Sequence, residues 1–186
     1  MSVLDDLKNH LTMMDQMRRM HLPPGAAAMP YASLEGYVLA NGHEFHSAPL
    51  TKAERTLVRH AMSASGSEFE IKQCYSNSQE LVLMDPSGEL QYAEGYVVKF
   101  DLPFPIHHGW AVLNGKVIDL TCRVRGDARS KGRWGDRVLG TFTDRVYFGR
   151  TFPTAEVRRA VMQRGWWGSL LDDYQNDFPY LTGGGW

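Results

Sequence analysis

The first twenty residues show apolar positions at helical spacing. Ser2 can cap the start of such a helix, and Asp5 and Asp6 suit the positive end of its dipole. The pattern therefore predicts an amphipathic helix from Ser2 to about Met20, ahead of a Pro-Pro-Gly sequence. The repeating apolar positions are Val3, Leu4, Leu7, Leu11, Met14 and Met17.

Further along the chain, short apolar runs alternate with turn signals. The sequence Thr51-Lys-Ala-Glu54 has the form of a capping box and predicts a helix to about Met62. Asp85-Pro-Ser-Gly88 predicts a turn. The other predicted elements are a short strand near Tyr37–Leu39, a helix over Cys74–Met84, strands over Leu90–Phe100 and Val138–Phe142, a helix from Thr154 to about Gln163, and a short helix over Gly168–Tyr174.

The clearest local signal is an Asn-Gly dipeptide between two apolar runs. Asn114 and Gly115 form the pair preferred in a two-residue type I′ turn, because both central residues of that turn need positive φ. A turn at these two residues also fixes which residues before it lie opposite those after it. The chain from about residue 105 to 121 is therefore predicted to be a β-hairpin of defined register.

This register brings a histidine and a carboxylate together. It sets Trp110 opposite Asp119 and His108 opposite Thr121. Because strand side chains alternate between faces, these four residues share one face, while His107 points to the other. His108 and Asp119 become diagonal neighbours within reach of an imidazole–carboxylate contact.

Cys74 supplies a nucleophile that fits this pair. A cysteine attacks as the thiolate, which a helix N-terminus and a neighbouring imidazolium both favour. A helix end contributes only about 0.3–1 kcal/mol, so a histidine is needed to form the ion pair and to protonate a leaving group. A carboxylate then orients the imidazole. The chain supplies these groups, in order, as Cys74, His108 and Asp119.

Other residues are candidates for the rest of the site. The backbone N–H of Cys74 is one possible oxyanion donor, and Gln73 is favoured as the second over Asn77 or a tryptophan such as Trp110. Three residues share one face of the predicted strand. They either line a substrate cleft, in which the glutamate selects a cationic group of the substrate, or form a half-buried aromatic face. These are Tyr92, Glu94 and Tyr96. Gly95 between them indicates a bulge or a close backbone approach.

Length, composition and charge fit one soluble domain. The chain has 186 residues, of which 43% are hydrophobic and 22% charged. Its net charge of −1 gives no general attraction to nucleic acid or to an anionic membrane. The sequence contains neither a membrane-spanning window nor a secretory signal pattern, and Cys74 and Cys122 are too few for a disulfide framework. We therefore expect reduced thiols and a cytoplasmic location in the producing or infected cell.

Two further features have competing interpretations. Residues 123–137 carry six basic side chains against two acidic ones and are predicted to be a solvated loop, or else a lid or docking patch for an acidic partner or nucleic acid. Trp134 is the only aromatic residue there, which argues against a platform for single-stranded nucleic acid, and nucleic acid is the less favoured partner. His43 and His46 lack further ligands at metal-binding spacing, and the chain has no nucleotide-binding motif. The sequence therefore predicts neither a metal nor a cofactor.

Three segments resemble the transglutaminase-like branch of the papain-like cysteine enzymes. They are Cys74 ahead of a helix, His108-Gly-Trp110 on a strand, and Val117-Ile-Asp-Leu-Thr121 on the next strand. Gly109 and Leu120 stand where that branch usually has Ala and Pro. The similarity covers roughly residues 70–150. With Tyr92-Ala-Glu-Gly-Tyr96 and Tyr147-Phe-Gly149, it extends to small proteins of bacteriophages and bacteria.

The resemblance implies an α+β fold with a papain/transglutaminase-like core. In that core, a helix opening with the cysteine packs on an antiparallel sheet that carries the histidine and the aspartate. The core is expected over residues 66–186, with residues 1–65 as an N-terminal helical appendage, together forming one compact unit.

The same resemblance implies a cysteine-dependent amide hydrolase or acyl transferase that acts on a protein or peptide amide through an acyl-enzyme. Cys74 would be the nucleophile, His108 the general base and acid, and Asp119 the orienting residue. Replacing Cys74 or His108 by Ala should then abolish turnover, and replacing His107 should change it little. The alternative is a non-enzymatic phage interaction or structural protein on the same scaffold.

Overall fold

The computed structural model describes residues 2–22, 29–66, 69–70, 72–102, 104–121 and 141–186. The helices in this part of the chain are α1 (Val3–Met20), α2 (Leu34–Asn41), α3 (Lys52–Ser65), α4 (Cys74–Leu83), α5 (Thr154–Arg164) and the short 3₁₀ helix η3 (Tyr174–Asn176). The strands are β1 (His43–Phe45), β2 (Gln91–Lys99), β3 (Ile106–Leu113), β4 (Lys116–Ile118) and β5 (Arg145–Phe152).

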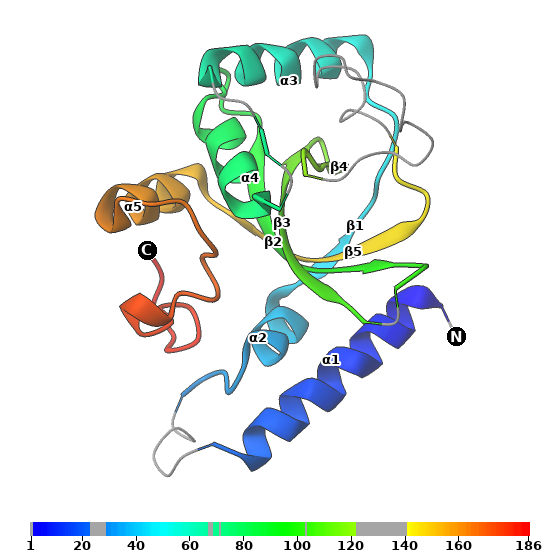
Figure 1. Cartoon of the computed structure of the whole chain (residues 1–186), viewed down its shortest axis with the longest axis vertical. Coiled ribbons are helices and arrows are strands. Elements are labelled where there is room, and N and C mark those ends of the chain that lie inside the picture. Colours follow the sequence, from blue (N-terminus) through cyan, green and yellow to red (C-terminus); the bar gives the residue numbers. More distant parts are fainter. Residues whose placement is uncertain (1, 23–28, 67–68, 71, 103, 122–140) are drawn as a thin grey trace.

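The strands form one curled antiparallel sheet in the order β1-β5-β2-β3-β4 (Figure 1). Helices pack against one face of this sheet: α4 contacts β2 and β3, α5 contacts β2, and α1 and α2 contact β5. The fold is therefore mixed α+β, as expected from the sequence. No helix in the described residues is long and apolar enough to cross a membrane.

Each face of the sheet has its own apolar cluster. The helix-covered face contributes Tyr92, Tyr96, Ala111 and Phe148 to the larger cluster, which also contains side chains from all five α-helices. The smaller cluster on the opposite face consists of Phe45, Ala93, Val97, Trp110, Val112, Val117 and Tyr147. Because successive strand residues alternate between these clusters, neighbouring residues on β3 meet different surroundings.

The predicted β3–β4 hairpin is confirmed. Asn114 and Gly115 have φ angles of 52° and 76°, the positive values that a type I′ turn requires. Val112 lies opposite Val117, as the turn predicted. The ladder with β4 ends at the pair Ala111–Ile118, so the expected pairs Trp110–Asp119 and His108–Thr121 lie beyond the paired part of the hairpin.

Several local predictions are also confirmed. Ser2 and Asp5 form a capping box at the start of α1, and Thr51 and Glu54 form one at the start of α3. The close backbone approach predicted at Gly95 occurs against β5: a Cβ at this position would lie 2.4 Å from the Cα of Gly149. The capping boxes depend on residues three positions apart, and the close approach depends on a glycine that has no side chain. Both can be recognised from the sequence.

The predicted strand at Tyr37–Leu39 is wrong, because these residues lie within α2. Ser33 caps this helix by accepting a hydrogen bond from the backbone N–H of Gly36. A short apolar run has no periodicity that distinguishes a buried strand from a buried helix.

Two other predicted elements differ in how far they can be compared with the structure. Residues 138–140 of the strand expected over Val138–Phe142 lie outside the described residues, and residues 141–142 are not in a strand. The helix expected over Gly168–Tyr174 is instead an irregular segment followed by η3. The backbone N–H groups of Leu170 and Leu171 donate to the carboxylate of Glu94, which is distant in sequence. These bonds take the place of the bonds that the same N–H groups would make within a helix.

The helices α1, α2 and α3 share the core of the remaining chain. Leu7, Leu11, Val38 and Val58 are fully buried in the same cluster as side chains of β2 and β3. In addition, β1 is an edge strand of the sheet, paired with β5. The division at residue 65 therefore does not separate two packing units.

Candidate active site

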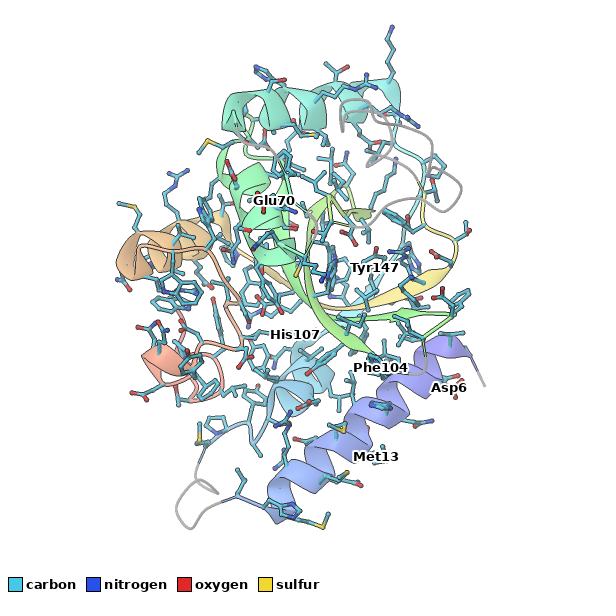
Figure 2. All side chains as sticks on the ribbon, viewed as in Figure 1. Asp6, Met13, Glu70, Phe104, His107 and Tyr147 are labelled. Atoms are coloured by element: carbon cyan, nitrogen blue, oxygen red, sulfur yellow. The ribbon has the colours of Figure 1, made fainter. Side chains whose placement is uncertain are left out.

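The candidate site is organised by two consecutive histidines on β3. His107 and His108 point to opposite faces of the sheet, as the register predicted. In Figure 2, His107 and Tyr147 lie on either side of the strands, with His107 toward the helix-covered face. Each histidine contacts a buried carboxylate on its own face.

His108 is paired with Asp119. The two side chains are buried, and His108 Nε2 lies 2.9 Å from Asp119 Oδ2. An ionised carboxylate only accepts hydrogen bonds, so with Asp119 ionised the donor in this contact is Nε2. The proton of a nucleophile would therefore exchange at Nδ1, the other ring nitrogen.

Two further groups hold Asp119 in place. Tyr147 Oη donates to Asp119 Oδ2 at 2.9 Å, and the backbone N–H of Thr121 donates to Oδ1 at 3.0 Å. Both carboxylate oxygens are thus hydrogen-bonded to groups on this side of the sheet. A carboxylate fixed at both oxygens can orient the imidazole of His108, as general acid–base chemistry requires.

Trp110 packs beside His108. The two rings are nearly parallel, with an interplanar angle of 18° and centroids 6.4 Å apart. Trp110 is fully buried against Phe45 and Tyr147. It is therefore a core residue that forms one wall of the His108 environment, and it does not line an open cleft.

Cys74 is the first residue of α4 and is buried. Its N-cap neighbour Gln73 makes no side-chain capping bond and is exposed. The geometry thus keeps the backbone N–H of Cys74 and the amide of Gln73 as candidates for an oxyanion hole.

The first two turns of α4 lie directly against β3 at Gly109. A Cβ at this position would lie 2.9 Å from Tyr92 Oη and 3.0 Å from Tyr75 Cδ1. Ser78 Oγ donates to the carbonyl of Gly109 at 3.1 Å. Gly109 therefore allows the helix that starts at Cys74 to approach the strand closely.

Asn77 connects α4 to the segment that carries Asp119. Its amide nitrogen donates to the carbonyl of Glu70 at 2.7 Å and to Thr121 Oγ1 at 3.2 Å, and its oxygen accepts from the backbone N–H of Glu70. Both amide hydrogens are used within the protein. Asn77 is thus a positioning residue in this structure and offers no donor for an oxyanion.

The start of α4 lies close to the segments that carry the His108 pair. This helix packs on β3, the strand of His108, and Asn77 of α4 bonds Thr121 beside Asp119. The structure therefore brings together His108 and Asp119, and it anchors the start of α4 to the strands that carry them.

The opposite face holds a second network that sequence reasoning missed. His107 Nδ1 is hydrogen-bonded to Tyr75 Oη at 3.0 Å, and His107 Nε2 lies 3.1 Å from Glu94 Oε1. Tyr92 Oη donates to Glu94 Oε2 at 2.8 Å. The alternation of Tyr92, Glu94 and Tyr96 with His107 across the ladder was the available signal, because strand pairing sets these residues on one face.

Glu94 anchors the chain that follows α5. The backbone N–H of Leu170 donates to Oε2 at 2.8 Å, that of Leu171 donates to Oε1 at 3.2 Å, and Ser169 Oγ also bonds Oε1. Burial by itself would raise the pKa of Glu94, but these donors and His107 outweigh burial and hold the pKa below its usual value. Glu94 is therefore an ionised, fully buried structural carboxylate.

The residues proposed to line a substrate cleft are interior. Tyr92 and Glu94 have no exposed surface, and Tyr96 is buried beside His107. Burial raises the pKa of the Tyr96 hydroxyl well above its usual value. Of the two interpretations offered by the sequence, the buried aromatic face agrees better with this geometry, and its glutamate is central to the packing.

Other sequence features contribute less. Cys122 and the basic segment 123–137 lie outside the described residues. Among the residues that the structure describes, no three His, Cys, Asp or Glu side chains are grouped to hold a metal ion.

Comparisons with protein-family models, with curated proteins and with solved structures find no match to this chain.

Proposed function

We propose that the protein is a cysteine-dependent amide hydrolase or acyl transferase in which Cys74, His108 and Asp119 act together. The observation that carries the proposal is the buried His108–Asp119 pair, with Asp119 held at both oxygens. A histidine buried beside a doubly held carboxylate is suited to proton transfer. The fold remains consistent with a papain-like arrangement, since the cysteine opens a helix that packs on an antiparallel sheet.

The position of α4 supports Cys74 as the nucleophile. Ser78 bonds the backbone of β3 next to His108, and Asn77 bonds Thr121. These two contacts tie the first turns of the helix to both segments that carry the acid–base pair. The helix that starts at Cys74 is therefore fixed in position relative to both His108 and Asp119.

The proposed reaction transfers an acyl group in two steps. The Cys74 thiolate attacks the amide carbonyl, an S–C bond forms, the C–N bond breaks, and the leaving amine takes its proton from the His108 imidazolium. Water or a second amine then attacks the thioester and gives its proton to His108. The acyl product leaves, and the thiolate and imidazolium are restored. Hydrolysis and transfer differ only in the acceptor that reaches the thioester.

The test is selective reactivity of Cys74 in the native protein. Iodoacetamide labelling at about pH 6, followed by peptide mass spectrometry, should modify Cys74 much faster than Cys122. An activated ester such as p-nitrophenyl acetate should acetylate Cys74 and release p-nitrophenol in a burst. His108→Ala should slow both reactions at least tenfold.

Controls distinguish an activated Cys74 thiol from one that is simply accessible to the reagent. Denatured protein gives the intrinsic rate of each thiol, and Cys74→Ala should remove the burst while leaving the circular dichroism spectrum unchanged. Asp119→Asn should slow acetylation while Cys74 remains accessible to a small neutral disulfide. If Cys74 reacts no faster than Cys122, or if His108→Ala leaves its rate unchanged, the proposed function is wrong and a non-catalytic role on the same scaffold is favoured.

A further inference from the structure

The helix α4 carries three consecutive polar side chains in the interior of the protein. Asn77, Ser78 and Gln79 are all buried. A buried polar group costs free energy unless it is hydrogen-bonded, and each of these side chains bonds a different part of the chain. Ser78 bonds the backbone of Gly109 on β3, and Gln79 bonds the backbone of Gly168 after α5. Polar contacts therefore fix the position of α4 in several directions.

Asn77 reaches the segment that follows β4. Its amide nitrogen donates to the carbonyl of Glu70 at 2.7 Å and to Thr121 Oγ1 at 3.2 Å, and its oxygen accepts from the backbone N–H of Glu70 at 3.2 Å. Both amide hydrogens and the amide oxygen are used, so the orientation of this side chain is fixed. Glu70 lies beside the first turns of α4 in Figure 2. Asn77 therefore ties the chain ahead of Cys74 to Thr121.

Thr121 makes hydrogen bonds toward both parts of the candidate site. Its hydroxyl oxygen accepts from Asn77 on α4, and its backbone N–H donates to Asp119 Oδ1 at 3.0 Å. Asp119 Oδ2 in turn lies 2.9 Å from His108 Nε2. Hydrogen bonds to an ionised acceptor are stronger than those between neutral groups. A short hydrogen-bonded chain therefore runs from the helix that begins at Cys74, through Thr121, to the imidazole of His108.

We propose that Thr121 is a positioning residue of this site, which holds α4 through its hydroxyl and Asp119 through its backbone. The inference rests on the proposed function, because it takes Cys74 as the nucleophile and His108 as its base. A misplacement of about 1 Å between reacting groups can cost about a hundredfold in rate. A residue that is bonded to both parts of the site therefore sets how well the thiol and the imidazole are matched.

Thr121→Val tests the hydroxyl, because valine keeps the backbone N–H and nearly the same volume but offers no acceptor to Asn77. Iodoacetamide labelling of Cys74 should be slower by about fivefold near about pH 6. The loss should be smaller near about pH 9, where the thiol ionises without help from the imidazole. Thr121→Ser keeps the hydroxyl and should return the rate to within about twofold of wild type.

Gln79→Ala is the matched control, because it removes another buried polar contact of α4, one that leads to Gly168. It should lower the urea midpoint at least as much as Thr121→Val does, because it leaves buried backbone groups without their partner. The shape of the Cys74 pH profile should stay as in wild type. A profile that changes equally in Gln79→Ala and Thr121→Val would show that Thr121 only stabilises the fold, and would overturn the proposal.

An NMR titration of the His108 imidazole separates this inference from the proposed function. The titration curve should shift in Thr121→Val and return in Thr121→Ser, whether or not the thiol reacts. If wild-type Cys74 reacts no faster than Cys122, the proposed function is wrong, and an unchanged His108 titration in Thr121→Val would then overturn the inference as well. If wild-type Cys74 is activated, and Thr121→Val changes neither its pH profile nor the His108 titration, the inference alone is wrong.

Discussion

His107 and His108 are neighbours in sequence, yet they belong to different parts of the molecule. His107 lies with Glu94 beneath the helices, where the carboxylate also holds the backbone of Leu170 and Leu171. His108 lies with Asp119 on the other face of the sheet, where both partners come from the same hairpin region. Both carboxylates are fully buried, so burial alone does not distinguish a structural pair from a catalytic one.

The difference lies in what else each carboxylate holds. Glu94 accepts from backbone groups of a segment about 75 residues away, so its removal would release that segment. Asp119 bonds the Tyr147 hydroxyl, the backbone N–H of Thr121 and the imidazole of His108. We infer that the first network stabilises the fold and that the second positions an imidazole. Variants on the two faces should therefore separate stability from reactivity.

The largest effect is expected when Glu94 is removed. Glu94→Ala leaves a histidine, two hydroxyls and two backbone amides without their buried acceptor, and should lower the free energy of unfolding by about 3–5 kcal/mol. Urea unfolding followed by circular dichroism measures this loss. Glu89→Ala, an exposed glutamate ahead of β2, is the control and should change stability by less than about 0.5 kcal/mol. A loss below about 1 kcal/mol for Glu94→Ala would contradict the structural role.

The two histidines should give opposite results. His107→Ala should lower stability by about 1–3 kcal/mol, because it removes the imidazole partner of the Tyr75 hydroxyl and one of the groups that contact Glu94, and should change Cys74 alkylation less than threefold. His108→Ala should slow alkylation at least tenfold. Urea unfolding and iodoacetamide labelling of the same two proteins measure both quantities. The reverse pattern would assign the acid–base role to His107, on the face that α4 covers.

Tyr147→Phe should have a smaller effect on the His108 face. The change removes one hydrogen bond to Asp119 and keeps the ring in its apolar cluster, so the free energy of unfolding should fall by about 0.5–1.5 kcal/mol. If Tyr147 positions the pair, alkylation of Cys74 should also slow, and its pH profile should change. Tyr174→Phe, on an exposed tyrosine of η3, should alter neither quantity.

The hairpin was predictable because its determinants are local. Asn114 and Gly115 specify the turn, and alternation then places His108 and Asp119 on one face. The capping boxes at Ser2 and Thr51 are local in the same sense. Such signals need only a few neighbouring residues to be read correctly.

The missed features depend on partners far along the chain. The segment at Leu170 has helical spacing, but its amides bond Glu94 instead of the preceding turn. His107 gave no signal of its own until strand pairing set it beside Tyr96. The relation of Cys74 to His108 also depends on how α4 packs on β3, which no spacing specifies. Long-range packing therefore decided what local patterns left open.

The smallest effect concerns the anchor of the hairpin. Glu54 accepts hydrogen bonds from Lys116, from Asn114 in the turn and from the backbone of Thr51. Lys116 contributes most, and together these contacts lower the pKa of Glu54 to about 2. A carboxylate with a lowered pKa stabilises the folded state above its unfolded pKa of about 4.3, and that contribution is lost as the pH falls toward about 2.

Glu54→Gln should therefore be less stable than wild type near neutral pH, and the two proteins should converge between about pH 5 and pH 2. Thermal unfolding across that range measures the difference, with Glu89→Gln as an exposed control. Because Glu54 holds the turn that sets the register, the variant should also slow Cys74 alkylation slightly if His108 is the base. A difference in the free energy of unfolding that stays constant with pH would contradict this prediction. It would show that Glu54 stabilises the hairpin through its packing and neutral hydrogen bonds, and not through the charge of its carboxylate.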